Sequence, residues 1–344
     1  FADPPITVFS GLRFNIDVYF WFEGTTATHE HAFCGAFQVL LGSSIHSWYQ
    51  FETHEVINAF TQTGEMKLKE CQLLNVGDAQ EIWAGNQYIH ALFHLDQPSA
   101  TIVVRTDRSP LHLPQLSYHK PGFAIDPFFE QDTVIKKLQV MGTLIRAKRE
   151  DADTIIAKML AASDLQTSYM ILTQLRRLLK SNQISQLFKL AGPKERFDKF
   201  LQIVVGRHGA AGEMLRAVFE RDDIVDQIIE RRGFVADPEH RFFMALLLNV
   251  DERERIYSLI NQRFPDVDPI EKVLDWVFDL AQTRVVGVEV SNALGIPDFG
   301  ENEMFVLEHL LHGKSDAEVI AAAESGTNAE DLTASIERIR NAII

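Results

Sequence analysis

Hydrophobic and polar residues alternate along residues 12–23, LRFNIDVYFWFE. Side chains of a β-strand point alternately to its two faces, so one face of this segment would be apolar throughout. That face carries Leu12, Phe14, Ile16, Val18, Phe20 and Phe22, and the other carries Arg13, Asn15, Asp17 and Glu23 with Tyr19 and Trp21 among them. The pattern predicts a half-buried antiparallel strand, in which the apolar face is normally the buried one.

Further segments rich in Val, Ile, Phe and Tyr follow up to residue 106, separated by glycines, as is typical of strands joined by turns. These segments are 28–32, 36–41, 44–52, 66–75, 80–83, 87–95 and 99–106. Many short strands at this spacing predict a sandwich or a small barrel. Residues 107–127 then carry four prolines and no sustained period, which predicts a crossover out of the barrel.

Beyond residue 127 apolar residues recur at positions i, i+3 and i+4, which predicts about ten helices. The predicted helices cover 133–148, 151–163, 168–181, 194–208, 213–233, 238–250, 254–264, 269–283, 302–314, 316–326 and 328–344. Side chains that cap helix starts occur at Asp151, Asp251, Asp268 before Pro269, Ser315 with Glu318, and Asn328. Gly233 and Gly313 suit helix ends, where glycine adopts a left-handed conformation most easily.

The expected fold class is therefore α+β, with an N-terminal β-barrel followed by an all-α helical domain. The expected domains are a barrel over 1–106, a proline-rich crossover over 107–127 and an all-helical domain over 128–344. Two domains also suit the length of 344 residues. The helices show no fixed repeat period, so the pattern does not favour a regular solenoid.

Composition narrows the classes of partner. The formal net charge of -15 argues against a nucleic-acid backbone or an anionic membrane as the main partner. No segment reaches the roughly 18 uninterrupted apolar residues of a membrane helix. The two cysteines, Cys34 and Cys71, do not form a disulfide framework, which favours a cytoplasmic location. The first residue is Phe rather than Met, so the native N-terminus is left open.

The candidate chemistry lies in the predicted barrel, because eight of the 12 histidines occur in the first 125 residues. His29 and His31 form a His-x-His pair, which on a strand places both imidazoles on one face. His90 on a later strand could complete three corners around one ion. Neutral imidazoles suit iron, zinc, copper and nickel. The alternatives are a solvated strand end for the pair and a hydrogen-bonded core histidine for His90.

Residues 24–42, GTTATHEHAFCGAFQVLLG, resemble the first cupin motif, in which a glycine precedes His-x-His, a glutamate follows and a second glycine ends the motif. His29 and His31 match the metal-binding pair, and Gly42 matches the closing glycine. The spacing from Gly24 to His29 is one residue short. The glutamate is absent, since Gly35 or Ala36 stands in its place.

Residues 77–94, GDAQEIWAGNQYIHALFH, resemble the second cupin motif. Gly77 and Gly85 match its glycines, with Trp83 in place of the motif's proline. Strict spacing puts Tyr88 at the histidine position, whereas His90 is displaced by two residues and His94 then occupies the asparagine position. The resemblance implies a double-stranded β-helix barrel over roughly the first hundred residues, about a third of the chain.

A cupin site without the glutamate is similar to that of the cysteine and thiol dioxygenase branch, which uses three histidines and iron(II). The resemblance implies a divalent transition metal at His29, His31 and His90, with iron(II) first and zinc, nickel or manganese left open. Three neutral ligands leave the metal charge uncompensated, which favours an anionic or thiolate ligand supplied by the substrate.

Several nearby residues have two readings. Tyr88 is a candidate proton donor or a plain core tyrosine, and His94 either fixes the tautomer of a ligand histidine or replaces the motif's asparagine structurally. His46 is expected to fill the barrel wall. The remaining expectations concern an oxygen ligand at Gln38, a thiolate or a buried thiol at Cys34, and exposed rings at His112 and His119.

Two functions follow. The first is a non-haem iron(II) dioxygenase that acts on a small thiol or carboxylate held in the barrel. The second is a non-catalytic module in which the barrel senses a small molecule or a metal and the helical domain binds a protein partner. The helices carry no catalytic motif, and their apolar stripes suit packing on the barrel, a protein partner or a homodimer.

Overall fold

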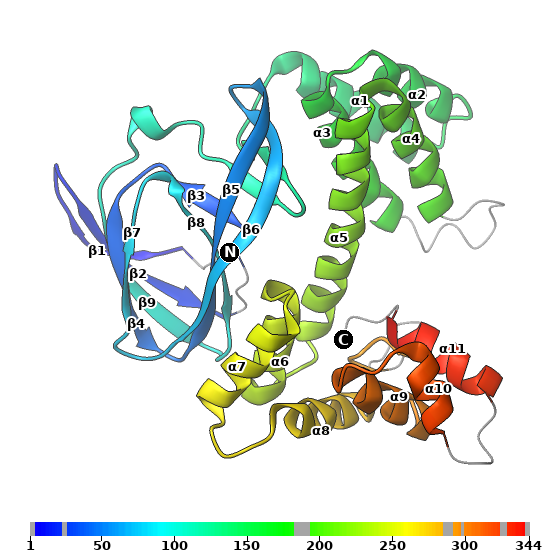
Figure 1. Cartoon of the computed structure of the whole chain (residues 1–344). Helices are drawn as coiled ribbons and strands as arrows, with labels where there is room; N and C mark the ends of the chain where they lie inside the picture. Colours follow the sequence, from blue (N-terminus) through cyan, green and yellow to red (C-terminus); the bar gives the residue numbers. More distant parts are fainter. Residues whose placement is uncertain are drawn as a thin grey trace.

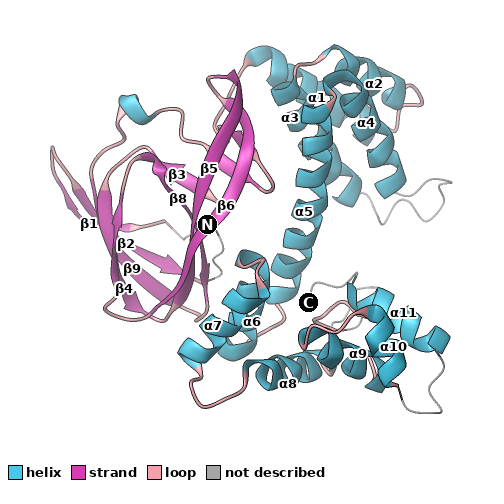
Figure 2. Cartoon of the chain, viewed as in Figure 1, coloured by secondary structure: helices cyan, strands magenta, loops and turns pink. Residues whose placement is uncertain are grey.

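The strands form two antiparallel sheets in the N-terminal part of the chain (Figures 1 and 2). The computed structural model describes residues 4–22, 26–181, 193–284, 292–296, 299–323 and 329–340. One sheet has the strand order β1-β2-β9-β4-β7, and the other closes into a barrel in the order β10-β11-β6-β5-β8-β3. The strands are β1 Ile6–Ser10, β2 Asn15–Trp21, β3 His29–His31, β4 Gly35–Leu41, β5 Ser44–Asn58, β6 Thr61–Leu74, β7 Ala79–Ile82, β8 Gly85–His94, β9 Ser99–Arg105, β10 Ser117–His119 and β11 Phe123–Ile125.

Strand β2 turns its apolar face away from the interior, so the expected burial of that face is wrong. Its other face carries Tyr19 and Trp21, which line a cavity between the sheets, and Asp17, which is 1% exposed. Arg105 on β9 donates its Nε–H to the Asp17 carboxylate over 3.0 Å. The aromatic rings and the paired charge make this face suitable for burial, and the alternation then forces Ile16, Val18 and Phe20 outward.

The barrel extends into the segment expected to be a crossover. Strand β10 pairs with β3 at Ser117 and His29, and β11 pairs with β6, so the closed sheet ends near residue 125 and not at 106. Each of these strands has only three residues, too few for a visible period. A Cβ on Gly122 would lie 1.8 Å from the Gly64 carbonyl oxygen, so glycine is required where this turn meets β6.

Helices make up the rest of the chain, which confirms the predicted α+β class with a barrel followed by an all-helical part (Figure 2). None of the described helices is both long enough and apolar enough to cross a bilayer. The helices are α1 Asp132–Arg146, α2 Ala152–Ala162, α3 Leu165–Ser181, α4 Pro193–His208, α5 Ala210–Arg232, α6 Pro238–Asn249, α7 Arg253–Arg263, α8 Pro269–Ala281, α9 Glu301–Leu311, α10 Asp316–Ala322 and α11 Ala329–Arg340, with a 3-10 turn over Pro110–His112.

Helix ends follow the capping residues in part. Asp268 accepts hydrogen bonds from the backbone N–H groups of Ile270 and Glu271, and Ser315 forms the predicted capping box with Glu318. Asp151 occupies the position before α2 without a side-chain bond, and α7 is preceded by Glu252 instead of Asp251. Gly313 is left-handed, with φ of 79°, whereas Gly233 stays right-handed at -60°. Asn328 lies outside the described residues.

The helices pack on the barrel through two apolar clusters. Ile45 on β5 and Phe93 on β8 belong to the same cluster as Phe242 and Trp276 of α6 and α8. Phe123 and Ile125 of β11 belong to a second cluster with residues of α1–α5. From Tyr88 to His94, β8 is buried on both faces. His90, Leu92 and His94 line the cavity between the sheets. On the other face Phe93 packs with helices, whereas Ile89 and Ala91 pack with residues of β5, β6, β10 and β11.

Arg241 of α6 fastens the helices to the end of β8. Its side chain is buried and donates from Nε to the Leu95 carbonyl at 2.7 Å and from Nη2 to the His94 carbonyl at 3.1 Å.

We expect Arg241→Met to lower the free energy of unfolding by about 3 kcal/mol, because it leaves two buried carbonyls without these donors. Urea titration measures the loss. Arg149→Met is the control, since Arg149 is exposed and bonds only its neighbour Asp151, and a loss as large as that of Arg241→Met would contradict the assignment.

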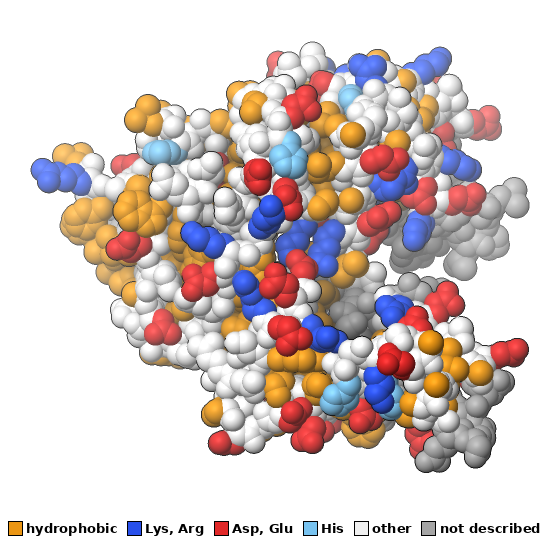
Figure 3. Space-filling model, in the orientation of Figure 1, with side chains coloured by type: hydrophobic (Ala, Val, Ile, Leu, Met, Phe, Trp, Pro, Cys, Tyr) orange, Lys and Arg blue, Asp and Glu red, His pale blue; other side chains and the backbone are white. Residues whose placement is uncertain are grey.

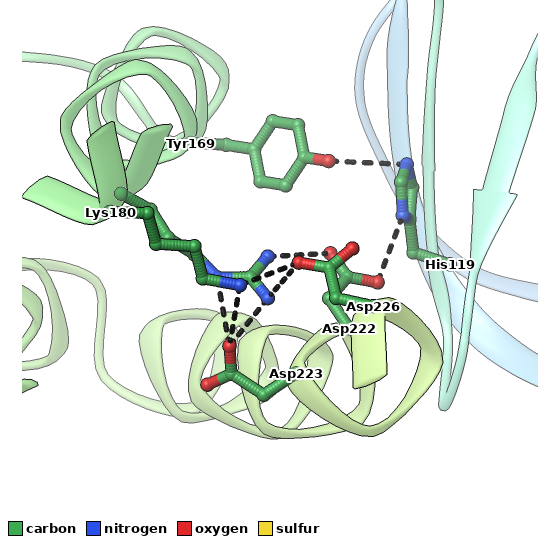
Figure 4. A network of polar contacts seen from close by, with 7 residues as sticks. His119, Tyr169, Lys180, Asp222, Asp223 and Asp226 are labelled. Atoms are coloured by element: carbon green, nitrogen blue, oxygen red, sulfur yellow. Dashed lines mark hydrogen bonds and ion pairs between the residues drawn. The ribbon is translucent and has the colours of Figure 1, made fainter. Parts of the chain in front are cut away.

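A second polar contact joins β10 to the helices (Figure 4). The Tyr169 hydroxyl of α3 lies 3.1 Å from Nε2 of His119, and Asp222 of α5 lies 3.7 Å from its Nδ1. The expected exposure of His119 is therefore wrong, whereas His112 is exposed as predicted. Arg176 and Lys180 of α3 extend this network by ion pairs to the carboxylates of α5, namely Asp222, Asp223 and Asp226.

Candidate metal centre

Strands β3 and β8 bring His29, His31 and His90 together, as the spacing predicted. His29 lies directly opposite His90 in the antiparallel pair, and an irregularity in β3 after His29 brings His31 opposite Gly85. The ring centroids are 4.6 Å apart for His29 and His31, 4.8 Å for His29 and His90, and 5.0 Å for His31 and His90. One ligand nitrogen from each ring lies within 4.8 Å of the others.

Hydrogen bonds leave Nε2 of His29 free for an ion and pair the Nε2 atoms of His31 and His90 with each other. Nδ1 of His29 lies 2.8 Å from the Ala27 carbonyl oxygen. Because a carbonyl only accepts, the proton sits on Nδ1 and the lone pair on Nε2. Nε2 of His31 and Nε2 of His90 share a hydrogen bond of 2.9 Å, so one of them carries a proton that an ion would displace. Two imidazole nitrogens about 2.0–2.1 Å from one ion and at a right angle to it would be about 2.9 Å apart. Three neutral imidazoles thus suit a transition metal, and one ion would draw the three nitrogens, now within 4.8 Å of one another, to at most the roughly 4.2 Å that two bonds of about 2.1 Å can span.

Burial keeps these imidazoles neutral, which is the form that binds a metal. Desolvation lowers the pKa of His29 and lowers that of His31 to about 3, with the neighbouring charges of His29, Arg105 and Arg108 adding to the second shift. Desolvation likewise holds the pKa of His90 well below its usual range. A proton therefore does not compete with a metal for these nitrogens at neutral pH.

The three histidines line a cavity of about 340 Å³ between the two sheets. Its walls are largely aromatic and aliphatic, which is typical of sites for small organic ligands. Arg108 also lines it, and no carboxylate does among the described residues. The remaining lining residues are Tyr19, Trp21, Thr26, Phe33, Phe37, His46, Ile82, Leu92, His94, Thr101, Val103 and Gln115.

Tyr88 and His94 lie near the cavity in different ways. The Tyr88 ring is 4.7 Å from His90 but packs in an apolar cluster with Phe37 and Ile82, and burial raises its pKa to about 12. Its hydroxyl meets the distance and angle of a hydrogen bond with none of the described residues. His94 lines the cavity, shares a hydrogen bond of 2.7 Å with Ser99 and stacks on Trp21 at 4.4 Å. Its observed bond therefore goes to Ser99 and not to a ligand histidine.

His46 lies closer to the three histidines than the sequence predicted. It fills the wall of β5 as expected, stacked on Phe37 at 5.0 Å, yet it also lines the cavity 6.0 Å from the His90 ring. Neither of its ring nitrogens has a hydrogen-bond partner among the described residues, and burial lowers its pKa to about 3. Its position follows from the register of β5 against β8, which sets His46 opposite Leu92 between His90 and His94 and for which the sequence carries no local signal.

Other expected contributors lie elsewhere. Gln38 is exposed and donates to the Gly77 carbonyl, and Cys34 is exposed, so neither lines the cavity. Gly24 of the first motif lies outside the described residues. Neither position considered for the missing glutamate could supply a ligand. A Cβ on Gly35 would lie 2.2 Å from the Val104 carbonyl oxygen of β9, and Ala36 is exposed on the face of β4 away from the cavity.

Glu30, between the two histidines, points to the opposite face of β3. Its carboxylate accepts the Tyr118 hydroxyl at 2.7 Å and the Leu116 backbone N–H at 3.1 Å. Burial raises the Glu30 pKa, and these two hydrogen bonds oppose the shift. The His-x-His segment therefore serves two faces, since Glu30 holds the region of β10 while the histidines face the cavity.

The solved structures similar to this chain cover about a third of it, with shares of 30% to 37% for the three described below. No protein-family profile and no curated protein sequence matches it. Among solved structures, a cupin-2 domain protein from Shewanella frigidimarina is 13% identical, with a TM-score of 0.21 over 30% of this chain and 79% of that one. A hydroquinone 1,2-dioxygenase from Sphingomonas is also 13% identical, with a TM-score of 0.24 over 30% of this chain and 66% of that one.

An oxalate oxidase is 14% identical, with a TM-score of 0.22 over 37% of this chain and 57% of that one. Likeness at this level says nothing about activity. The cupin-like barrel predicted from the two motifs is confirmed by the closed sheet and its strand order.

Proposed function

We propose that His29, His31 and His90 bind one divalent transition metal and that the cavity beside them binds a small anionic molecule. The convergence of three neutral imidazoles from two strands carries this proposal. Three neutral ligands leave the charge of the ion uncompensated. Arg108 adds a positive charge near His31, and the described cavity wall supplies no carboxylate to offset it. The favoured ligand of the cavity is therefore a molecule with a carboxylate or a thiolate.

The reaction we propose is iron(II)-dependent dioxygenation of a small thiol or carboxylate. Bound iron(II) would supply electrons for oxygen chemistry and open coordination positions for the reactants. The chain's own residues would hold the metal, orient the guest through Arg108 and exclude water by the aromatic walls of Trp21 and Phe37. Both cysteines are free, which supports a reducing, cytoplasmic location.

Oxygen consumption tests the reaction. We expect iron(II)-loaded protein to consume oxygen with members of a panel of small thiols and carboxylates, and not with the matching amides and alcohols, because only the anions balance the charge of the site. Zinc-loaded protein is the control, since zinc fills the same ligands without redox chemistry. A protein that binds iron but consumes oxygen with no member of the panel would contradict the dioxygenase and leave the metal site standing.

The second candidate is a sensing module, and the two-sided burial of β8 favours it. His90 and His94 face the cavity, while Phe93 packs among the helices and Arg241 bonds the His94 carbonyl. A guest that shifts β8 would therefore move residues in contact with the helical part. Intact folding without metal, together with ligand-dependent hydrogen-exchange protection of α6, would support this role over the enzyme.

A further inference from the structure

The outward face of the five-stranded sheet is apolar across four strands except at Gln38 of β4, which lies opposite Ile102. The register sets Ile16 of β2 opposite Phe9 of β1 and Val104 of β9, and Val104 opposite Ala36 of β4. One step along the strands, Val18 lies opposite Ile6 and Ile102. Residues directly opposite one another in a sheet share a face, so these side chains form one continuous surface. Hydrophobic side chains gather at this end of the molecule in Figure 3.

This surface is largely open. The exposed fractions are 58% for Ile6, 46% for Phe9 and 40% for Val104. Six more large apolar residues on or beside the face are also exposed, namely Val8, Leu12, Phe14, Phe22, Leu40 and Leu41. Taking roughly 200 Å² for a fully exposed large apolar side chain, the nine residues together expose about 1,000 Å². The largest apolar patch of a typical monomer is about 300–600 Å², so this face is large for a free surface.

The edge of the sheet is equally unprotected. All five residues of β1 are exposed, and none of them is charged or proline. Free edge strands usually avoid pairing with another chain through charged residues, prolines or bulges. Of these three features, β1 has one irregularity in its pairing, between Thr7 and Phe9. The apolar face thus continues to an open edge.

We propose that a second copy of this chain covers the outward face of β1, β2, β9 and β4 in a two-fold symmetric dimer. The net charge of -15 makes two copies repel, and an interface without ionised side chains adds least to that repulsion. The residues set opposite one another in this face are apolar apart from the uncharged Gln38. Stable dimers bury about 800 Å² per partner, which this face can supply. Two sheets that pack face to face form an ordinary apolar interface.

The dimer differs from the one expected from the helices and does not depend on the metal. The cavity opens toward the other face of the same sheet, through Tyr19, Trp21 and Thr101. A partner on the outward face would therefore contact the side of the sheet opposite the cavity and would not enter the site.

Sedimentation velocity of the full chain tests the interface between 1 and 100 µM. We expect a species of twice 39.0 kDa. Val104→Glu should weaken association by at least about a hundredfold, because the symmetry places two like charges in one apolar interface. Ile6→Glu should do the same at the edge strand, where a fold defect is least expected. Val56→Glu is the matched control, since Val56 is equally apolar, 62% exposed and outside this face.

Circular dichroism and metal content of each variant separate lost association from lost folding. A wild-type chain that stays monomeric at 100 µM would overturn the proposal. A dimer that survives both Val104→Glu and Ile6→Glu would also overturn it, since the contact would then lie elsewhere. Neither result would bear on the metal site, because all three ligand histidines face away from this surface.

Discussion

His90→Ala will reduce metal binding by the barrel by at least tenfold and leave the protein folded. Even changes in residues behind the ligands cost ten- to a hundredfold in affinity, and removal of a ligand should cost no less. His90 lies opposite His29 and 2.9 Å from His31 between their Nε2 atoms, so two nitrogens would remain where three converged. Elemental analysis after dialysis against iron(II), zinc or nickel measures the loss.

The control for His90→Ala is His112→Ala. His112 is an exposed histidine in the same part of the chain, outside the cavity of His29, His31 and His90. It reports any unspecific binding of metal by surface imidazoles. If His29→Ala and His90→Ala both keep the metal content of the wild type, the site assignment is wrong whatever the activity shows.

The ligand set was within reach of the sequence because strand geometry is local. His29 and His31 share a face by the period of two, and the same period places His90, Leu92 and His94 on one face of β8. The sequence could not show that His29 pairs with His90, since register depends on long-range contacts. It could not show Arg108 or Gln115 either, because both stand on a connection without a period.

The direction of β2 shows a different limit. The alternation separated an apolar face from a mixed face correctly, but it did not say which face is inside. Tyr19 and Trp21 line the interior cavity, while Ile16 and Phe20 lie on the outward face proposed to bind a partner. Both kinds of face are apolar, and only the position of the second sheet decides between them. The helices were easier, since the apolar stripe of an amphipathic helix marks its buried side directly.

The buried histidines around the cavity should lower the free energy of unfolding as the pH falls. Desolvation lowers the pKa of His31 and of His46 to about 3, and it lowers that of His29, His90 and His94 as well. In the unfolded chain these groups titrate near 6.5. Below that pH the unfolded chain binds more protons than the folded one, so acid favours unfolding.

The loss begins as the pH falls through about 6.5 and continues toward the folded values near 3 for His31 and His46. Each of these two histidines should cost about 2 kcal/mol between pH 7.5 and pH 5. Metal-free protein, prepared with a chelator, should therefore lose about 4 kcal/mol or more of unfolding free energy in urea over this range. Glu30 acts in the opposite direction, because burial raises its pKa, and the comparison with a single variant removes this contribution.

His46→Leu is that variant, because His46 can be replaced without touching the three proposed ligands. It removes two buried nitrogens that lack hydrogen-bond partners. We expect the pH-dependent loss to shrink by about 2 kcal/mol, while metal content stays that of the wild type. Equal losses for both proteins would mean that His46 is charged or hydrated in the folded state, and the dry cavity wall inferred here would then be wrong.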